Sequence, residues 1–269
     1  MGNGIAQTAA AAGYQVVMRD VEERFVERGL DTIRNNLNRM VKKGSIAESS
    51  VQDILGRIHG TTDLMELTEA DLIIEAIVEK IEPKKALFQE LDAICKPETI
   101  FATNTSGLSV TEIAASTNRR DRCIGIHFFN PVPMMKLAEI IRAPETSEET
   151  VAKAGSVVDA FGKKGILVDD APLFVVNRIL VPMINEAIFV LSEGTASAED
   201  IDEGMKLGAN HPIGPLALAD LIGLDTLLFV IETLYTETSD SKYRPAPLLK
   251  KMVRAGYLGR KTGRGFYNY

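Results

Sequence analysis

The sequence contains few of the residues that are typical of disulfide-rich and metal-binding proteins. Its 269 residues include no tryptophan, three histidines and two cysteines, Cys95 and Cys123. Two cysteines, each within an apolar stretch, are too few for a disulfide framework or a cysteine-rich metal cluster. We therefore expect no metal site and a reducing compartment, the cytoplasm.

Positive charge and long apolar runs are also scarce. The chain has 30 Lys and Arg against 37 Asp and Glu, a formal charge of −7. Binding to a nucleic-acid backbone needs an excess of cations, so no nucleic-acid partner is expected, and an anionic ligand must meet a local basic cluster. The longest apolar run, 174–191, contains Asn177, Arg178, Asn185 and Glu186, which argues against a membrane partner.

Short apolar runs alternate with helical patterns in the first part of the chain. Strands are predicted at 15–20, 71–78 and 99–103, with helices beginning at Gly2, Val26 and Pro83. This order predicts an α/β fold, a Rossmann-type doubly wound sheet whose ligand lies beyond the carboxyl ends of the strands. A helical hairpin at about 21–57 interrupts it, and the pattern from Ser45 to Glu48 predicts a capping box at its second helix.

The composition changes after Pro172, where no further strand is predicted. Helices are expected at 174–193, 198–207, 215–236 and 246–255. We therefore predict a Rossmann domain at 1–172 and an all-helical domain at 173–269. Its long apolar helices would need a partner chain to cover them, which predicts a homodimer through this domain.

The segment 123–141 contains a histidine within an apolar run. Residues 124–129 and 137–141 predict short strands joined by a tight, proline-rich connection. In a hairpin centred on Pro133, Glu139 lies directly opposite His127, at roughly 5 Å between Cβ atoms. The carboxylate could then fix the imidazole tautomer for acid/base work. The structural alternative is a core histidine bonded to a carbonyl, with Glu139 in solvent.

Polar residues also follow the other predicted strands. Glu79, Asn104 and Ser106 lie at or near strand ends, as His127 does. Their convergence at one sheet edge favours a ligand site, although a polar residue that ends a strand is usually a turn former.

The amino-terminal segment matches the second half of a dinucleotide-binding fingerprint. Gly2 begins a small-residue helix, a strand follows, and Asp20 ends that strand. A complete fingerprint has a strand and two more glycines before Gly2. We therefore expect Met1 to be an internal residue of a longer natural chain, preceded by a β-branched strand that ends in Gly-x-Gly-x. A helix that merely starts with glycine is the alternative.

Five ordered blocks resemble the (S)-3-hydroxyacyl-CoA dehydrogenase family, and most of all its bacterial 3-hydroxybutyryl-CoA members. The resemblance covers the whole chain. The five blocks are Ala102-Thr-Asn-Thr-Ser-Gly-Leu, His127-Phe-Phe-Asn-Pro-Val-Pro-Met-Met, Asp170-Ala-Pro-Leu-Phe-Val-Val-Asn-Arg, Gly214-Pro-Leu-Ala-Leu-Ala-Asp-Leu-Ile-Gly-Leu-Asp and Gly259-Arg-Lys-Thr-Gly-Arg-Gly-Phe-Tyr. Leu173 departs from the pattern, because the family usually has Gly there.

The resemblance implies an oxidoreductase of fatty-acid and butanoate metabolism that uses NAD and an acyl-CoA substrate. NAD is expected in preference to NADP because Asp20 can accept hydrogen bonds from both ribose hydroxyls but repels a 2′-phosphate. It assigns His127 and Glu139 as the catalytic pair, with Ser106 and Asn177 on the reacting acyl group. The residues expected near the cofactor are Gly2, Asp20, Glu79, Lys84, Asn104, Ser106, Asn130 and Lys261. Coenzyme A is expected on the inserted hairpin, where we place Asn36, Lys42 and Lys43.

Two other interpretations stay open at this point. A related hydroxy-acid dehydrogenase would share the fold, but such enzymes usually use a lysine base. A non-catalytic protein, either crystallin-like or a simple dinucleotide binder, would also keep the fold. Oxidation of a 3-hydroxyacyl-CoA coupled to NAD would distinguish all three.

Overall fold

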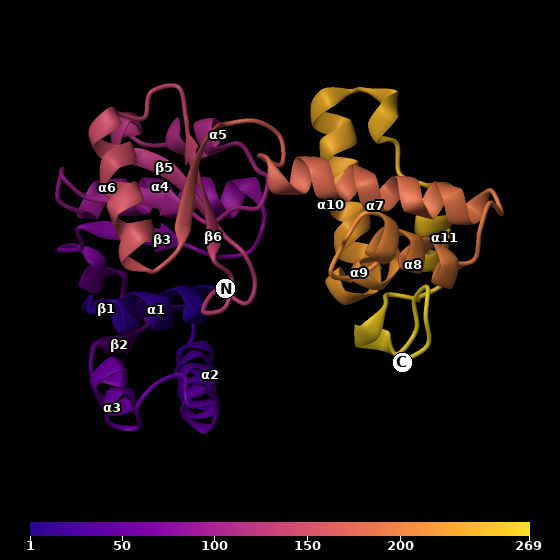
Figure 1. Ribbon diagram of the computed structural model, residues 1–269. Coiled ribbons are helices and arrows are strands. Elements are labelled where there is room, and N and C mark those ends of the chain that lie inside the picture. The colour runs from indigo at the N-terminus through magenta and orange to yellow at the C-terminus, as the bar shows by residue number, and fades with distance from the viewer. The chain divides into compact units, whose positions relative to one another are not determined.

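The computed structural model describes residues 1–269 and divides into two compact units, Met1–Asp170 and Ala171–Tyr269 (Figure 1). The strands, all in the first unit, are β1 (Val16–Arg19), β2 (Ile58–Thr61), β3 (Leu72–Glu75), β4 (Ile100–Thr103), β5 (Cys123–Phe128), β6 (Leu137–Arg142) and β7 (Lys164–Asp169). Its helices are α1 (Gly2–Ala11), α2 (Glu23–Lys42), α3 (Ser49–Leu55), α4 (Ile81–Ile94), α5 (Val110–Ala114) and α6 (Glu148–Ala160). Two short 3₁₀ helices, η1 (Leu64–Leu67) and η2 (Arg120–Arg122), complete the unit.

The strands form two separate sheets. The larger has the order β3-β4-β5-β6-β7 and is parallel except for the antiparallel pair β5-β6. The smaller sheet is the parallel pair β1-β2. The α/β, doubly wound prediction is confirmed. The strands predicted at 15–20, 71–78 and 99–103 are observed with shorter bounds, and those predicted at 124–129 and 137–141 are observed as β5 and β6, with bounds that differ by one residue. Strand β2 was not predicted, because Ile-His-Gly-Thr is too short to show a clear alternation.

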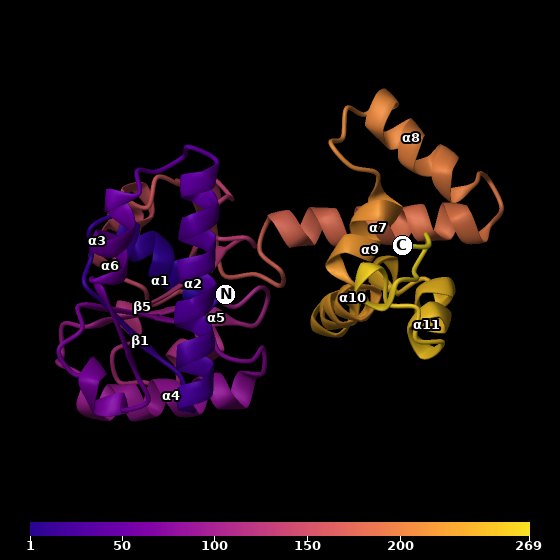
Figure 2. The same cartoon turned by 90° about the horizontal axis from the view of Figure 1, so that it is seen from below.

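Helices cover both faces of the larger sheet. Side chains of α1 and α6 pack with Ile100 and Ala102 of β4 on one face, while α4 and α5 pack with Phe101 on the other. Successive residues of a strand point to opposite faces, so this single strand contributes to both cores. Figure 2 shows β5 between α6 and α4. The layers leave the carboxyl ends of the parallel strands as the edge where polar loops gather.

Helices α1, α2 and α3 share a core of their own. Ala6 and Ala10 of α1 pack against Ile33 and Leu37 of α2, together with residues of α3. The predicted capping box at Ser45 is wrong, because α3 starts four residues later, after Glu48, and no side chain caps it. The chain between the two helices forms a turn instead.

The second unit is entirely helical. It consists of α7 (Val176–Ser192), α8 (Ala198–Gly208), α9 (Pro215–Ile222), α10 (Leu224–Thr238), α11 (Pro247–Arg254), and the 3₁₀ helices η3 (Ser241–Tyr243) and η4 (Arg260–Thr262). The single helix predicted at 215–236 is wrong. Gly223 has φ +100° and separates α9 from α10, because only glycine adopts this conformation without strain. No helix of the chain is both long and apolar enough to span a membrane.

Leu173 adopts a conformation that glycine would favour. Its φ is +62°, in the left-handed region, and its side chain is buried among the helices of the second unit. The departure of this residue from the family pattern therefore falls on a backbone position where a β-carbon is disfavoured.

Candidate active site

His127 and Glu139 face each other across the antiparallel pair β5-β6. The observed register pairs these two residues directly, so the predicted hairpin register is confirmed. The Nδ1 atom of His127 lies 2.7 Å from Oε2 of Glu139, and both side chains are buried. A carboxylate on Nδ1 favours the tautomer with its proton there and stabilises the imidazolium form. The alternative interpretation placed Glu139 in solvent. That placement is wrong, because Glu139 is buried and bonded to His127.

A second group of polar residues lies where β4 ends. Asn104 is buried and its Oδ1 accepts a hydrogen bond from the backbone N–H of Phe128, at 2.9 Å, which fixes the end of β4 against that of β5. The Ser106 N–H donates to Oε1 of Glu79 at 2.7 Å, and the Thr105 hydroxyl donates to the same oxygen at 2.6 Å. Glu79 therefore holds the loop that carries Ser106.

Lys84, in helix α4, is buried next to this loop. Its ammonium is 2.7 Å from Oε1 of Glu75 and 3.3 Å from Oε2 of Glu79. The Glu75 carboxylate also accepts from the Ile77 N–H and from the Thr103 hydroxyl, both at 2.7 Å. The buried lysine thus links two carboxylates, one in β3 and one in the loop after it.

Glu75 was not predicted as a site residue. The signal that could have identified it is a carboxylate that follows Leu-Ile-Ile within a strand, because acidic side chains are almost never fully buried unless they are paired. Its partner, Lys84, lies nine residues further along the chain. Their pairing depends on the turn from β3 into α4, which the sequence does not specify.

Another buried lysine fixes the connection between β5 and β6. Lys163 donates to the carbonyl oxygens of Val132 and Met135, at 2.6 and 2.7 Å. Desolvation by burial lowers the pKa of Lys163. This connection also contains Asn130, which is exposed and precedes a cis peptide bond to Pro131. Lys163 was not predicted, and nothing in its local sequence marks it.

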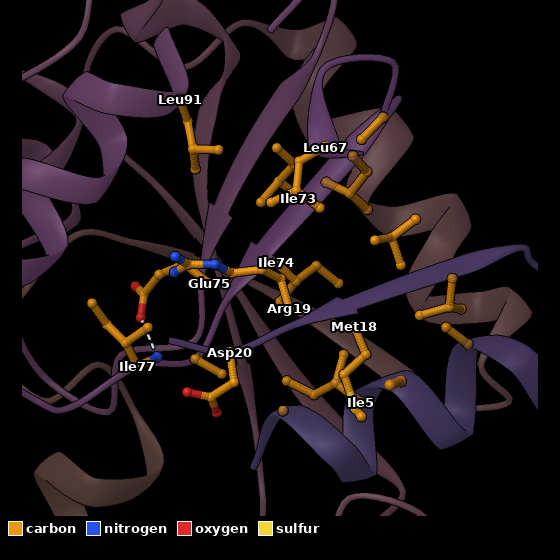
Figure 3. Close-up of a pocket in the computed structure, with 18 of the residues that line it drawn as sticks. Ile5, Met18, Arg19, Asp20, Leu67, Ile73, Ile74, Glu75, Ile77 and Leu91 are labelled. Atoms are coloured by element: carbon orange, nitrogen blue, oxygen red, sulfur yellow. Dashed lines mark hydrogen bonds between the residues drawn. The ribbon is translucent and has the colours of Figure 1, made fainter. Parts of the chain in front are cut away.

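The amino-terminal candidates lie along one cavity of the first unit. Asp20 directly follows β1 and Gly2 begins α1, and both residues line this cavity. The Asp20 carboxylate accepts from the N–H of Val21 at 2.7 Å. Arg19 donates from Nε to the carbonyl oxygen of Thr62 at 3.2 Å, and Figure 3 shows it beside Asp20.

The coenzyme A candidates occupy α2 and its end. Lys42 and Lys43 are exposed at the carboxyl end of α2, and Asn36 is half-buried, donating to Gln7 at 3.4 Å. Two further candidates belong to the second unit. Asn177 lies in the first turn of α7, and Lys261, in η4, forms an ion pair with Asp225. In the first unit, direct contacts join Glu79 to Ser106 and Lys84, and His127 to Glu139, while Asn104 bonds to the backbone of Phe128, next to His127.

Comparison with known proteins identifies the family. The family model described as "3-hydroxyacyl-CoA dehydrogenase, NAD binding domain" matches residues 1–171, and "3-hydroxyacyl-CoA dehydrogenase, C-terminal domain" matches 174–269. The chain belongs to the 3-hydroxyacyl-CoA dehydrogenase family. The family resemblance inferred from the five sequence blocks is therefore confirmed.

Similar proteins in this dehydrogenase family match the chain over its full length. A probable 3-hydroxybutyryl-CoA dehydrogenase of Bacillus subtilis is 54% identical over 269 residues, which cover 100% of this chain and 94% of the relative. The 3-hydroxybutyryl-CoA dehydrogenase of Clostridioides difficile is 51% identical and is covered to 96%. The crystal structure of (S)-3-hydroxybutyryl-CoA dehydrogenase from Ralstonia eutropha has a TM-score of 0.97 at 54% identity, with 100% of this chain and 95% of that chain covered.

The family assignment determines the class of reaction. This 3-hydroxyacyl-CoA dehydrogenase family member is an oxidoreductase enzyme, and the match of its first unit to an NAD-binding domain supports a nicotinamide dinucleotide as cofactor. The predicted enzyme class is confirmed. The choice between NAD and NADP and the roles of individual residues remain predictions.

Proposed function

We propose that the protein interconverts (S)-3-hydroxybutyryl-CoA and the corresponding 3-oxoacyl-CoA with NAD, as an enzyme of fatty-acid metabolism. The observation that carries this proposal is the buried His127–Glu139 pair, with 2.7 Å between Nδ1 and Oε2. Relatives that are 49–54% identical over the whole chain bear the name 3-hydroxybutyryl-CoA dehydrogenase, which supports this substrate.

The residues present fit a dinucleotide. The amino terminus of α1 offers N–H groups and the positive end of a helix dipole to a pyrophosphate, and Asp20 offers a carboxylate to the hydroxyls of a ribose. Both positions line the same cavity. When bound, the nicotinamide would accept or supply the hydride at C3 of the acyl chain. Glu79, Asn104, Asn130 and Lys261 complete the proposed cofactor set.

In this proposal Lys84 is a positioning residue, which orients Glu79 and does not contact the cofactor. Its ammonium is already bonded to Glu75 and Glu79 and is 1% exposed. It would therefore act on the cofactor site by holding Glu79 and the loop of Ser106, which Glu79 anchors.

His127 is the proposed acid and base. With Nδ1 directed at Glu139, Nε2 is the atom that would take the proton of the 3-hydroxyl group during oxidation and return it during reduction. Glu139 would stabilise the imidazolium that forms. Ser106 and Asn177 would hydrogen-bond the acyl oxygens and so orient C3.

A lysine base, as used by related hydroxy-acid dehydrogenases, is disfavoured by the geometry of the first unit. Its two buried lysines are Lys84 and Lys163. Lys84 is bonded to two carboxylates, and Lys163 is bonded to two backbone carbonyls. Both ammonium groups already form structural bonds, whereas His127 is paired through Nδ1 with the Glu139 carboxylate, an arrangement that suits proton transfer.

The remaining parts of the proposal concern partners and location. Lys42 and Lys43, which are exposed cations on an acidic protein, would bind coenzyme A. Four large apolar side chains of the second unit are more than half exposed, which supports a homodimer through this unit: Ile179, Leu207, Leu221 and Phe229. A cytoplasmic location stays a prediction.

The His127→Gln variant tests the function. It should lower turnover with 3-hydroxybutyryl-CoA and NAD by roughly 10² to 10⁴, the usual range for general acid/base catalysis. Glu139→Gln should also slow turnover, and the double variant should lose much less than the two effects multiplied. His59→Gln is a matched control, because His59 forms a 2.7 Å pair with Glu66 on the surface. Near-normal turnover of His127→Gln would end the assignment.

A further inference from the structure

The loop at residues 104–109, between β4 and α5, is held by side chains. It forms neither helix nor strand. Each of the four backbone N–H groups from Thr105 to Leu108 instead donates to a side-chain oxygen, which belongs to Thr103, Glu79 or Thr105 itself. The shape of the loop that carries the proposed substrate contact therefore depends on three side chains.

The hydroxyl of Thr105 makes most of these bonds. It accepts from the N–H of Leu108 at 3.0 Å and from the N–H of Gly107 at 3.3 Å, and it donates to Oε1 of Glu79 at 2.6 Å. A hydroxyl offers one donor and two acceptor lone pairs, so these three bonds use its whole capacity. The Thr105 side chain is fully buried, so solvent has no access to replace them.

Both ends of the loop are fixed by separate bonds. At the start, the Asn104 side chain accepts from the Phe128 N–H at 2.9 Å. At the end, Ser109 caps α5 by accepting from the Glu112 N–H at 3.1 Å. What remains to be set is the course of residues 105–108, and the bonds to Thr105 set it.

Glu79 connects the middle of the loop to a buried charge. Its Oε1 accepts from the Thr105 hydroxyl and from the Ser106 N–H, and its Oε2 lies 3.3 Å from the Lys84 ammonium. Hydrogen bonds to an ionised group are shorter and stronger than neutral ones, which agrees with the 2.6 and 2.7 Å at this carboxylate. Ser106 is thus held through its own N–H and, through Thr105, at the two residues that follow it.

We propose that Thr105 is a positioning residue for the reaction, because its buried hydroxyl fixes the place of Ser106 in the loop. The proposal rests on the proposed function, in which Ser106 orients the acyl group. A displacement of about 1 Å in a group that orients a reactant can cost roughly 10²-fold in rate. One hydroxyl that contacts no reactant would therefore act on turnover through its neighbour.

The Thr105→Val variant tests this role, since valine keeps the size and β-branching and removes only the hydroxyl. Amide hydrogen exchange of Gly107 and Leu108 should become at least about tenfold faster. The kcat/KM for 3-hydroxybutyryl-CoA should fall about 10- to 100-fold, with a rise of about threefold or more in its KM. The KM for NAD should stay within about twofold, because Glu79 keeps its bond from Ser106. An unfolded fraction would instead lower kcat and leave both KM values unchanged.

Two further variants serve as controls. Thr105→Ser keeps the hydroxyl, so its amide exchange and its kcat/KM should return close to those of the parent. Thr117→Val removes a comparable hydroxyl from the same unit, because Thr117 is 4% exposed and donates to the Ala114 carbonyl at 3.0 Å. It lies outside the loop and should leave the exchange of Gly107 and Leu108 unchanged.

The outcomes separate this proposal from the proposed function. Unchanged exchange in Thr105→Val would overturn the proposal, and so would faster exchange with unchanged kcat/KM or a loss that Thr105→Ser does not restore. Each of these results leaves the role of Ser106 intact if Ser106→Ala is impaired. Normal turnover of Ser106→Ala would refute the proposed role of Ser106 itself, and the positioning role of Thr105 with it.

Discussion

Replacement of Lys84 by methionine should destabilise the first unit severely. The ammonium of Lys84 is buried between Glu75 and Glu79, and the Glu75 side chain is fully buried as well. Methionine keeps most of the volume and removes the charge. Glu75 would then remain as a buried carboxylate that keeps only its bonds from the Ile77 N–H and the Thr103 hydroxyl.

The expected loss can be worked from this geometry. Removal of one partner of a buried ion pair typically costs about 3–5 kcal/mol, because the other charge stays buried without compensation. For a protein of this size that loss lowers the melting temperature by roughly 6–20 °C. The double variant Glu75→Gln/Lys84→Met removes both charges and should recover about 2 kcal/mol or more. The two residues should therefore be strongly non-additive.

Urea unfolding followed by far-ultraviolet circular dichroism would measure these differences, since the chain has no tryptophan. Lys153→Met is a suitable control, because Lys153 forms an exposed pair with Glu149 one helical turn away. Its unfolding midpoint should stay close to that of the parent. A Lys84→Met variant as stable as the parent, or a double variant no more stable than Lys84→Met, would refute the reasoning.

Three further predictions concern the ligands and a thiol. NAD should give a higher kcat/KM than NADP, because the Asp20 carboxylate repels a 2′-phosphate; the reverse preference would mean that Arg19 dominates. Replacement of Lys42 and Lys43 by Ala should raise KM for the acyl-CoA with little change in kcat, and an unchanged KM at low salt would contradict this. Burial raises the pKa of the Cys123 thiol from 9.0 to about 11, so its contribution to stability is complete below pH 9 and is lost as pH rises through about 11. The unfolding free energy should fall over this range less steeply in Cys123→Ala than in the parent.

The hairpin was predictable because two local rules determine it. Strand side chains alternate with a period of two, and a short proline-rich connection permits few registers. His127 and Glu139 therefore had to share a face once the centre lay at Pro133. The observed register agrees.

Other features depended on information that is not local. The apolar periodicity continues through Gly223, so nothing in the pattern distinguishes one helix from two, although this residue has a positive φ in the structure. Glu75 and Lys163 were missed because their partners are set by tertiary structure. A charged residue within an apolar strand, such as Glu75, can be noticed in the sequence, but its partner cannot be identified from it.

Side-chain hydrogen bonds between neighbouring strands hold the residues of the candidate site in place. Three hydrogen bonds join the ends of neighbouring strands in turn: Thr103 to Glu75, the Phe128 N–H to Asn104, and His127 to Glu139. They connect β3 to β4, β4 to β5 and β5 to β6. Polar side chains on rigid strands lose little freedom when they bind a reactant, which is the condition for electrostatic preorganisation. The residues that hold this edge together therefore include those proposed to carry out the chemistry, so substitutions at His127 or Glu139 should be read for stability as well as for turnover.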